Sequence, residues 1–453
     1  MKRHSARWVK TELRSAKLGD RRLDKRLAII VEAFANLPQA SIPQATGLWS
    51  KTKAAYRFLN NKKVTPDNIL QPHQQATQKR VGQKKVVLAV QDTTSLNYTH
   101  LPKTQGLGHI GTDPRSRGMI VHTTLALTPQ RLALGIIAQQ SWTRPQYGSA
   151  EKRGKKSIDH KESQKWLHSF AATEELQKQI PQTLLINVAD RESDVYELFL
   201  QASSCRTKLL IRAAWDRRVD HCQKHLWPYL EAQPLAAIQQ VQITRRKEKK
   251  SRTATVEIRF AKVTLKPPRR APALCSLSLY AVYVNESHPP RGEQALSWML
   301  LTTLKLRSVA QAIQCCEYYA VRFTIELFHK VLKSGCRVEK RQLQSAEGLR
   351  RCLALDSLIA CRILSLTMLG RTAPDLPCSV IFEDHEWQSL YCFIHQTAKP
   401  PKAAPSLNEA IRWIARLGGF LGRKADGHPG AIVLWRGLQR LSDISLAWIT
   451  FRH

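Results

Sequence analysis

The chain has 453 residues, of which 71 are Lys or Arg and 35 are Asp or Glu, so its formal net charge is +36 at pH 7. A hydrophobic content of 43% and a charged content of 23% indicate a globular protein, large enough for two or three domains, and not a disordered chain. The excess positive charge favours a polyanionic partner, because basic side chains that neutralise phosphates release condensed counterions. Since the basic residues run along the whole chain, we expect nucleic acid; a ribosome-associated or merely basic protein is the alternative.

Secretory, membrane-spanning and zinc-bound classes do not fit this sequence. The first ten residues are basic and contain no apolar segment, so we expect no signal peptide. The most apolar stretch, residues 352–369, is interrupted by Asp356 and Arg362 and is typical of a buried helix. The ten cysteines show no CxxC pair and no Cys/His zinc spacing, which indicates free thiols in a reducing cytoplasm.

Residues 1–70 have a helical pattern with basic side chains. Asp20 is a candidate N-cap, and the helix that follows carries Arg22 and Arg26 beside its apolar residues. A second helix is predicted over residues 51–60, again with basic and aromatic side chains. We expect a DNA-binding module that uses Arg22 and Arg26, and a solvated helix face is the alternative.

From residue 84 the periodicity changes to that of an α/β core. Continuous apolar runs at residues 86–90 and 184–188 are typical of strands covered on both faces. Further strands are predicted at residues 119–127 and 131–138, and a helix at residues 162–176. Asp92 and Asp190 follow the two buried strands, where α/β sheets place their ligand sites.

Residues 205–305 contain short alternating segments, which predict a β-rich region. Helices resume at Val309 and continue past Leu369. Proline-rich breaks at residues 372–377 and 398–405 precede a helical C-terminal module.

A helix predicted over residues 315–334 has a polar face and an apolar face. At 3.6 residues per turn its polar residues share one stripe roughly 80° wide. They are Tyr319, Arg322, Glu326, Lys330 and Lys333. The residues expected to face the core are Val321, Ile325, Phe328 and Leu332.

Asp92, Asp190 and Glu326 are the candidate metal ligands. Three carboxylates on a basic protein suit two Mg²⁺ or Mn²⁺ ions, which hold the attacking and leaving oxygens of a phosphoryl displacement. Taken singly, each acid fits a capping or salt-bridge role as well. His329, at the edge of the polar stripe, fits a phosphate contact or a surface residue better than a metal neighbour.

Several segments resemble motifs of the bacterial cut-and-paste DDE transposases of the insertion-sequence-four family. The family signature Y-(2)-R-(3)-E-(6)-K is matched by Tyr319, Arg322, Glu326 and Lys333. Residues 91–96 and 190–194 resemble the two aspartate motifs of the family. Residues 296–302, which include Trp298, resemble the segment with a base-binding tryptophan, and residues 414–420 resemble the dimerisation region.

This resemblance implies an RNase H-like catalytic core at residues 71–372 with a β-rich insertion at about 236–306. It also implies a helical DNA-binding domain at 1–70 and a helical dimerisation domain at 373–453. The partners would be double-stranded DNA, as transposon ends and target, and a second copy of the chain in a synaptic dimer. No membrane and no small-molecule cofactor is expected, and the location would be the bacterial cytoplasm, at the nucleoid.

The resemblance also implies a role for each site residue. Asp92, Asp190 and Glu326 would be catalytic and hold two Mg²⁺ ions, for which Mn²⁺ can substitute. Trp298 would stack on a flipped base during hairpin formation; without the resemblance, a tryptophan packed in the core is the favoured reading. The remaining residues would contact DNA, namely Tyr319, Arg322, Lys330, Lys333 and Arg212.

Three functions therefore compete at this stage. The first is a transposase that binds terminal repeats, excises the element through a hairpin intermediate and joins its 3′-hydroxyl ends to target DNA. The second is an RNase H-like nuclease or resolvase without strand transfer. The third is a DNA-binding relative that occupies transposon ends without cutting them.

Overall fold

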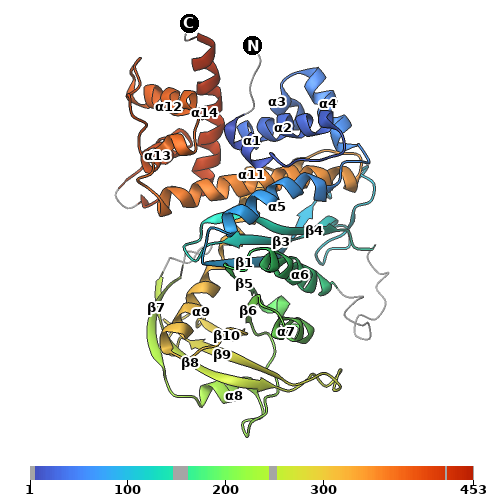
Figure 1. Cartoon of the computed structure of the whole chain (residues 1–453), viewed down its shortest axis with the longest axis vertical. Coiled ribbons are helices and arrows are strands. Elements are labelled where there is room, and N and C mark those ends of the chain that lie inside the picture. Colours follow the sequence, from blue (N-terminus) through green and yellow to red (C-terminus); the bar gives the residue numbers. More distant parts are fainter. Residues whose placement is uncertain (1–5, 146–161, 244–251, 424–425, 452–453) are drawn as a thin grey trace.

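One mixed β-sheet runs through the middle and the lower part of the molecule (Figure 1). The computed structural model describes residues 6–145, 162–243, 252–423 and 426–451. Within these residues ten strands pair in the order β2-β3-β1-β5-β6-β10-β9-β8-β7, and β4 also pairs with β3. Their bounds are β1 Val86–Asn97, β2 Gly108–His109, β3 Arg117–Leu127, β4 Ala133–Trp142, β5 Leu184–Ala189, β6 Lys208–Arg212, β7 Ala237–Ile243, β8 Arg252–Leu265, β9 Leu277–Asn285 and β10 Ser297–Thr302.

The strands β1, β5 and β6 are parallel, and the other pairings are antiparallel. The parallel pairing of β1 with β5 ends at Val90 and Val188. We expected the strand β1 to end at the same point as this pairing, and that expectation is wrong. The strand continues to Asn97 because β3 goes on pairing with it beyond that point, with Asp92 opposite Thr123.

The predicted β-rich region extends the central sheet. Strand β10 pairs with β6, with Leu300 opposite Arg212, and β9, β8 and β7 follow outward. The β-rich character of residues 205–305 is confirmed, and the antiparallel pairing of β6 with β10 explains how these strands join the parallel part.

The N-terminal part is helical, as predicted. Asp20 caps the second helix, and its carboxylate accepts a hydrogen bond from the Arg22 backbone at 2.8 Å. The domain boundary expected at residue 70 lies inside α5. The helices here are α1 Arg7–Glu12, α2 Arg21–Asn36, α3 Ile42–Thr46, α4 Trp49–Leu59 and α5 Pro66–Val81.

The helix expected over residues 315–334 is interrupted. Helix α9 (Val309–Val321) ends in tight turns, in which Arg322 N–H donates to the Tyr319 carbonyl at 3.0 Å and Ile325 N–H to the Arg322 carbonyl at 3.1 Å. Helix α10 (Thr324–Lys330) follows, and then a π-helical turn η4 (Val331–Gly335). The prediction of one continuous helix with a single polar stripe is therefore wrong. The predicted apolar side is nevertheless buried at Ile325, Phe328 and Leu332.

Helix α11 (Ala346–Thr372) lies beneath the N-terminal helices and the C-terminal helices, which form the top of Figure 1. By length and composition it is the one helix of the described residues that could cross a membrane, and 83% of its most apolar window is buried inside the fold. The remaining elements are α6 Gln164–Gln179, η3 Arg191–Ser193, α7 Tyr196–Ser203, α8 Leu226–Glu231, η5 Val338–Lys340, η6 Cys378–Val380, α12 Asp384–His395, α13 Leu407–Leu417 and α14 Ala431–Phe451.

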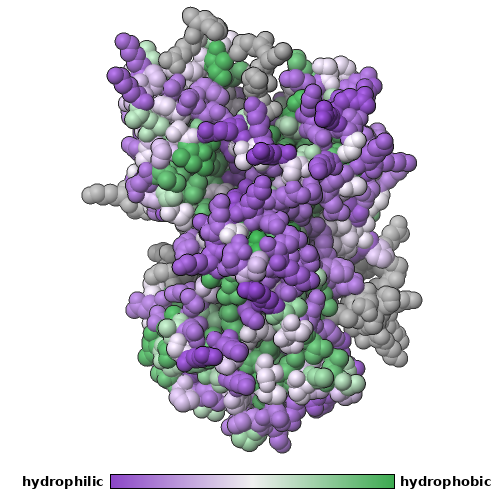
Figure 2. Space-filling model, in the orientation of Figure 1, coloured by the Kyte–Doolittle hydropathy of each residue, from purple (hydrophilic) through white to green (hydrophobic). Residues whose placement is uncertain are grey.

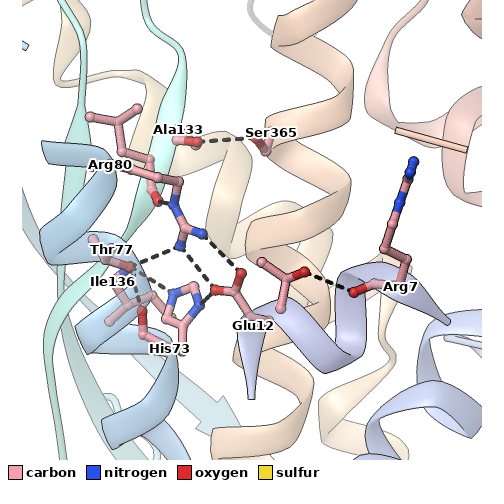
Figure 3. A network of polar contacts seen from close by, with 10 residues as sticks. Arg7, Glu12, His73, Thr77, Arg80, Ala133, Ile136 and Ser365 are labelled. Carbon is pink, nitrogen blue, oxygen red and sulfur yellow. Dashed lines mark hydrogen bonds and ion pairs between the residues drawn. The ribbon is translucent and has the colours of Figure 1, made fainter. Parts of the chain in front are cut away.

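A buried polar network attaches α1 to the sheet (Figure 3). Both guanidinium –NH₂ groups of Arg80 donate to the Glu12 carboxylate at 2.9 Å. His73 accepts from the Ile136 backbone through Nε2 at 2.9 Å, so its Nδ1 carries the proton that is donated to Glu12. Burial raises the pKa of Glu12, but the hydrogen bonds from His73 and Arg80 outweigh it and lower that pKa to about 2.

We predict that Glu12→Gln lowers the free energy of unfolding near neutral pH by about 3 kcal/mol. The folded-state pKa lies below the ordinary value, so the stabilisation is complete above about pH 4.5 and is lost as the pH falls toward 2. Melting temperatures of both proteins, measured from pH 7 down to pH 3, should differ most at pH 7 and approach each other toward pH 3. Glu175→Gln is the matched control, since its pair with Lys178 is solvent-exposed and its loss should change the melting temperature little. A constant difference between wild type and Glu12→Gln at every pH would contradict the assignment.

Candidate active site

Asp92 and Asp190 lie at the same edge of the parallel part of the sheet. Asp92 is two residues beyond the last β1–β5 pair, and Asp190 directly follows β5. The Asp190 carboxylate accepts a hydrogen bond from the Glu192 backbone at 3.0 Å and so caps η3. The Asp92 carboxylate accepts from the Thr93 backbone at 2.8 Å. Parallel pairing thus places the two carboxylates on neighbouring strands.

Glu326, on α10, is linked to Asp92 by Arg322. The Arg322 guanidinium donates to Glu326 at 3.0 Å, and it lies 4.0 Å from the carboxylate of Asp92. Arg322 itself is buried and stacks on Phe323, with 4.5 Å between the guanidinium carbon and the ring centroid. A single cation therefore contacts carboxylates from β1 and from α10.

The three carboxylates act on one another electrostatically. Burial is the main cause that raises the pKa of Asp92 to about 6; the charges of Asp190 and Glu326 also raise it, while the Thr93 backbone and Arg322 lower it. Ionised Asp92 is thus held in an environment where another cation would be favourable. Carboxylates that are held close together despite their repulsion are typical of functional sites.

We predict that Asp92→Asn stabilises the protein in the presence of a chelator. The folded-state pKa is above the ordinary 3.8, so ionised Asp92 destabilises the fold above about pH 6, and this cost disappears as the pH falls below about 4. The gain on substitution should reach about 3 kcal/mol at pH 8 and vanish near pH 4. Melting curves at the two pH values test this, and a variant that melts below wild type at pH 8 would contradict it.

The donor set suits hard divalent cations, although the carboxylates are not drawn together around one point. Among the described residues no group of three or more His, Cys, Asp or Glu side chains has the arrangement of a metal site. The chemistry still fits, because carboxylate oxygens are the ligands that Mg²⁺ and Mn²⁺ prefer and their mutual repulsion favours a cation.

The sequence did not lead us to predict a buried polar network next to Asp92. His122 on β3 lies 3.1 Å from Gln91 Oε1 and 2.9 Å from Thr93 Oγ1. Gln91 in turn donates to Asn187 on β5. Burial lowers the pKa of His122 to about 3, so the ring is neutral and joins β1, β3 and β5 as a hydrogen-bonding group. The available signal was polar residues inside otherwise apolar strands.

Of the two roles that we expected for His329, a phosphate contact or a surface residue, the surface residue is wrong. Its side chain is buried, with Nδ1 at 3.9 Å from the Asp92 carboxylate. Burial, together with Lys333, lowers the pKa of His329 to about 3 and keeps the ring neutral. The side chain therefore shapes the pocket around Asp92 without adding charge.

Trp298 lies inside an aromatic cluster, where its ring is covered. The residue is 5% exposed and contacts Tyr319 edge-on, with ring centroids 5.2 Å apart; Phe323 lies 6.4 Å away. A base cannot stack on this ring unless one of those neighbours moves. In this structure Trp298 is a tryptophan packed in the core, which was the alternative to base stacking. Tyr319 is buried as well, so a DNA contact by this side chain would also require its neighbours to move.

Arg212 lies beside this aromatic cluster. Its guanidinium donates to the Ser297 carbonyl at 2.7 Å. Burial raises the pKa of Tyr319, while Arg322 and Arg212 lower it, which places both cations near its hydroxyl. The structure therefore brings Tyr319, Arg322 and Arg212 together with Asp92 and Asp190.

We predict that Trp298→Ala lowers the free energy of unfolding by about 3–5 kcal/mol, because it removes a buried aromatic side chain. The comparison is Trp215→Ala, whose side chain is 66% exposed and which should change the melting temperature little. Thermal melting of the three proteins checks this. Equal melting temperatures would show that the ring of Trp298 is free to serve another purpose.

The remaining predicted DNA contacts are exposed or partly exposed, but not all are near the acidic residues. Lys330 and Lys333 lie one and two turns beyond Glu326. Arg22 and Arg26 lie on α2 at the top of Figure 1, far from β10 and α9, and Arg22 pairs with Asp20 at 2.8 Å. Hydrophilic residues predominate across the middle of the face in Figure 2, as expected for so charged a chain.

Comparison with known proteins assigns both ends of the chain. Residues 5–64 match the family model described as "Transposase DNA-binding", and residues 358–447 match "Transposase Tn5 dimerisation domain". Together they support a DNA transposase similar to that of Tn5, the protein of this kind that the sequence motifs also resemble, with DNA and a second copy as partners.

One solved structure is similar over much of the length. A piggyBac transposase synaptic complex with hairpin DNA, solved by cryo-electron microscopy, covers 80% of this chain and 72% of its own at 10% identity, with a TM-score of 0.35. A likeness this weak carries no argument about the site.

Proposed function

We propose that the protein is a cut-and-paste DNA transposase of the insertion-sequence-four family, with Asp92, Asp190 and Glu326 as its catalytic carboxylates. The observation that carries this proposal is that the Arg322 guanidinium contacts Asp92 on β1 and Glu326 on α10, with Asp190 directly after the neighbouring strand β5, in a chain whose two ends match transposase domains. An RNase H-like core is proposed from the same arrangement, in which β4, β3, β1, β5 and β6 are adjacent and the last three are parallel.

Asp92, Asp190 and Glu326 would hold two Mg²⁺ ions, for which Mn²⁺ can substitute. Such ions, when bound, acidify the attacking water or 3′-hydroxyl and stabilise the leaving oxygen. The residues of the chain have separate tasks. Arg322 can grip a phosphate in two places because its guanidinium is planar, while the ammonium groups of Lys330 and Lys333 act as point charges along the strand.

The proposed reaction consists of successive displacements at phosphorus. Water first breaks one strand at the element's end and leaves a 3′-hydroxyl, which attacks the opposite strand and closes a hairpin while the flanking DNA leaves. A second water opens the hairpin, and the 3′-hydroxyl then attacks target DNA. The N-terminal module would bind the terminal repeats, and the C-terminal module would join two copies so that each cuts the end its partner holds.

We predict that Asp190→Asn and Glu326→Gln each reduce cleavage at least about 100-fold, because each removes a carboxylate on which transition-state stabilisation depends. The assay uses full-length protein, Mg²⁺, and a plasmid carrying the inverted DNA ends that flank its gene. Glu347→Gln is the matched control, since this exposed carboxylate on α11 pairs only with Arg350 in the described contacts, and it should cleave like wild type.

Two further readouts complete that experiment. Metal binding should raise the melting temperature of wild type without DNA, and raise it less in Asp190→Asn, because a ligand that binds only the folded state stabilises it. A transposase should give hairpinned ends from excision and joined products from strand transfer, whereas a simple nuclease would give linear ends alone. Cleavage that persists in Asp190→Asn would overturn the assignment of the acids. The products thus distinguish a transposase from a nuclease without any assumption about Trp298, whose ring is buried.

A further inference from the structure

A basic cavity of about 510 Å³ begins directly after Asp190. It is lined by η3, by the loop that follows β6 and by the segment that follows β8. Its volume is in the range of about 300–1,000 Å³ that ligand sites occupy. Two carboxylates, Glu192 and Asp194, face five cations in its lining, namely Arg191, Arg217, Arg218, Lys266 and Arg270.

Asp194 builds one wall of this cavity. Its buried carboxylate accepts hydrogen bonds from the backbone of Ala214 at 2.7 Å and of Trp215 at 3.0 Å, and it pairs with Arg217 at 2.5 Å. Arg217 is therefore used to hold the loop, and a fully paired buried network of this kind makes a wall rigid. The loop presents Trp215 at the cavity with two thirds of its surface exposed.

Arg218 and Lys266 keep their charge available, whereas Arg270 pairs with the Glu197 carboxylate at 3.0 Å. Arg218 donates to the neutral Pro267 carbonyl at 2.7 Å, and Lys266 pairs with Asp220 at 3.1 Å in an exposed contact worth little. Arg191, which also lines the cavity, directly follows Asp190. The cavity therefore lies next to the candidate active site.

We propose that this cavity binds one unpaired nucleotide of the DNA strand next to the cut site, with its base on Trp215 and its phosphates near Lys266 and Arg218. A paired base is covered by its neighbours in the stack, whereas an unpaired base can lie against an exposed ring beside cations, as in single-strand binding proteins. The inference rests on the proposed function, in which the strands at the cut site separate from the duplex. It also accounts for Trp215, a large aromatic that is left two thirds exposed by the described residues.

The test measures the binding of two fluorescein-labelled DNAs to full-length protein by anisotropy. One is an oligothymidylate of about eight nucleotides, within the site sizes of single-strand binding proteins, and the other is a duplex of similar length. Trp215→Ala should weaken binding of the single strand by about tenfold, since stacking of one base contributes about 1–3 kcal/mol. Binding of the duplex should change less than about twofold, because phosphate contacts dominate it.

Three controls separate stacking from other effects. Trp215→Phe keeps a ring and should retain most of the single-strand affinity, and Phe393→Ala, an exposed aromatic on α12, should leave it unchanged. Lys266→Gln should make the salt dependence of single-strand binding less steep by roughly 0.7, the value for one lost phosphate contact. Competition with ATP tests a free nucleotide as the ligand.

The possible results are distinct. Unchanged single-strand binding in Trp215→Ala, equal loss in Phe393→Ala, or stronger competition by ATP than by unlabelled oligothymidylate would each overturn the cavity proposal. If wild type cleaves its DNA ends normally in the same preparation, the proposed function stands. A wild-type protein that binds neither DNA would overturn the proposed function itself.

Discussion

The ion pair between Arg341 and Asp356 connects the parts of the molecule on which the candidate site depends. The Arg341 guanidinium donates to the Asp356 carboxylate at 2.6 and 3.0 Å, and also to the Ala40 carbonyl at 2.6 Å. It stacks on Phe34 at 4.3 Å as well, so one side chain joins α2, η5 and the central helix α11. Because both charges are buried, removing either partner would leave an unpaired charge at a cost of about 3–5 kcal/mol.

The same region sets the position of β1 and therefore of Asp92. Next to Arg341, the Glu339 carboxylate accepts a hydrogen bond from the Asn97 backbone at the end of β1, at 2.8 Å. The other end of the strand is held by its parallel pairing with β5, up to Val90 and Val188. Asp92 lies between these two attachments, with His122 and Gln91 hydrogen-bonded beneath it. A rigid support of this kind is what a carboxylate needs if it is to remain close to other carboxylates.

Charge is distributed unevenly around this support. The chain carries a large positive excess, yet Asp92 lies where burial makes its ionisation unfavourable, as its raised pKa shows. Arg322 partly compensates them, and the cations beyond Asp190 continue around Trp215. A negatively charged strand would therefore meet cations on its way to a cluster of acids, and it is the cations that would supply attraction over distance.

Local pattern was enough to predict the Asp20 cap, the buried apolar runs at residues 86–90 and 184–188, the β-rich region and the apolar side of α10, because these follow from periodicity and capping within a few residues. Only the tertiary structure decided that the β-rich strands extend the central sheet, that the helix breaks at Arg322, and that Trp298 and His329 are buried. Those outcomes depend on neighbours distant in the chain. Trp298, for example, is covered by Tyr319 and Phe323, which arrive from a helix after the strand, and no spacing within β10 reports that contact.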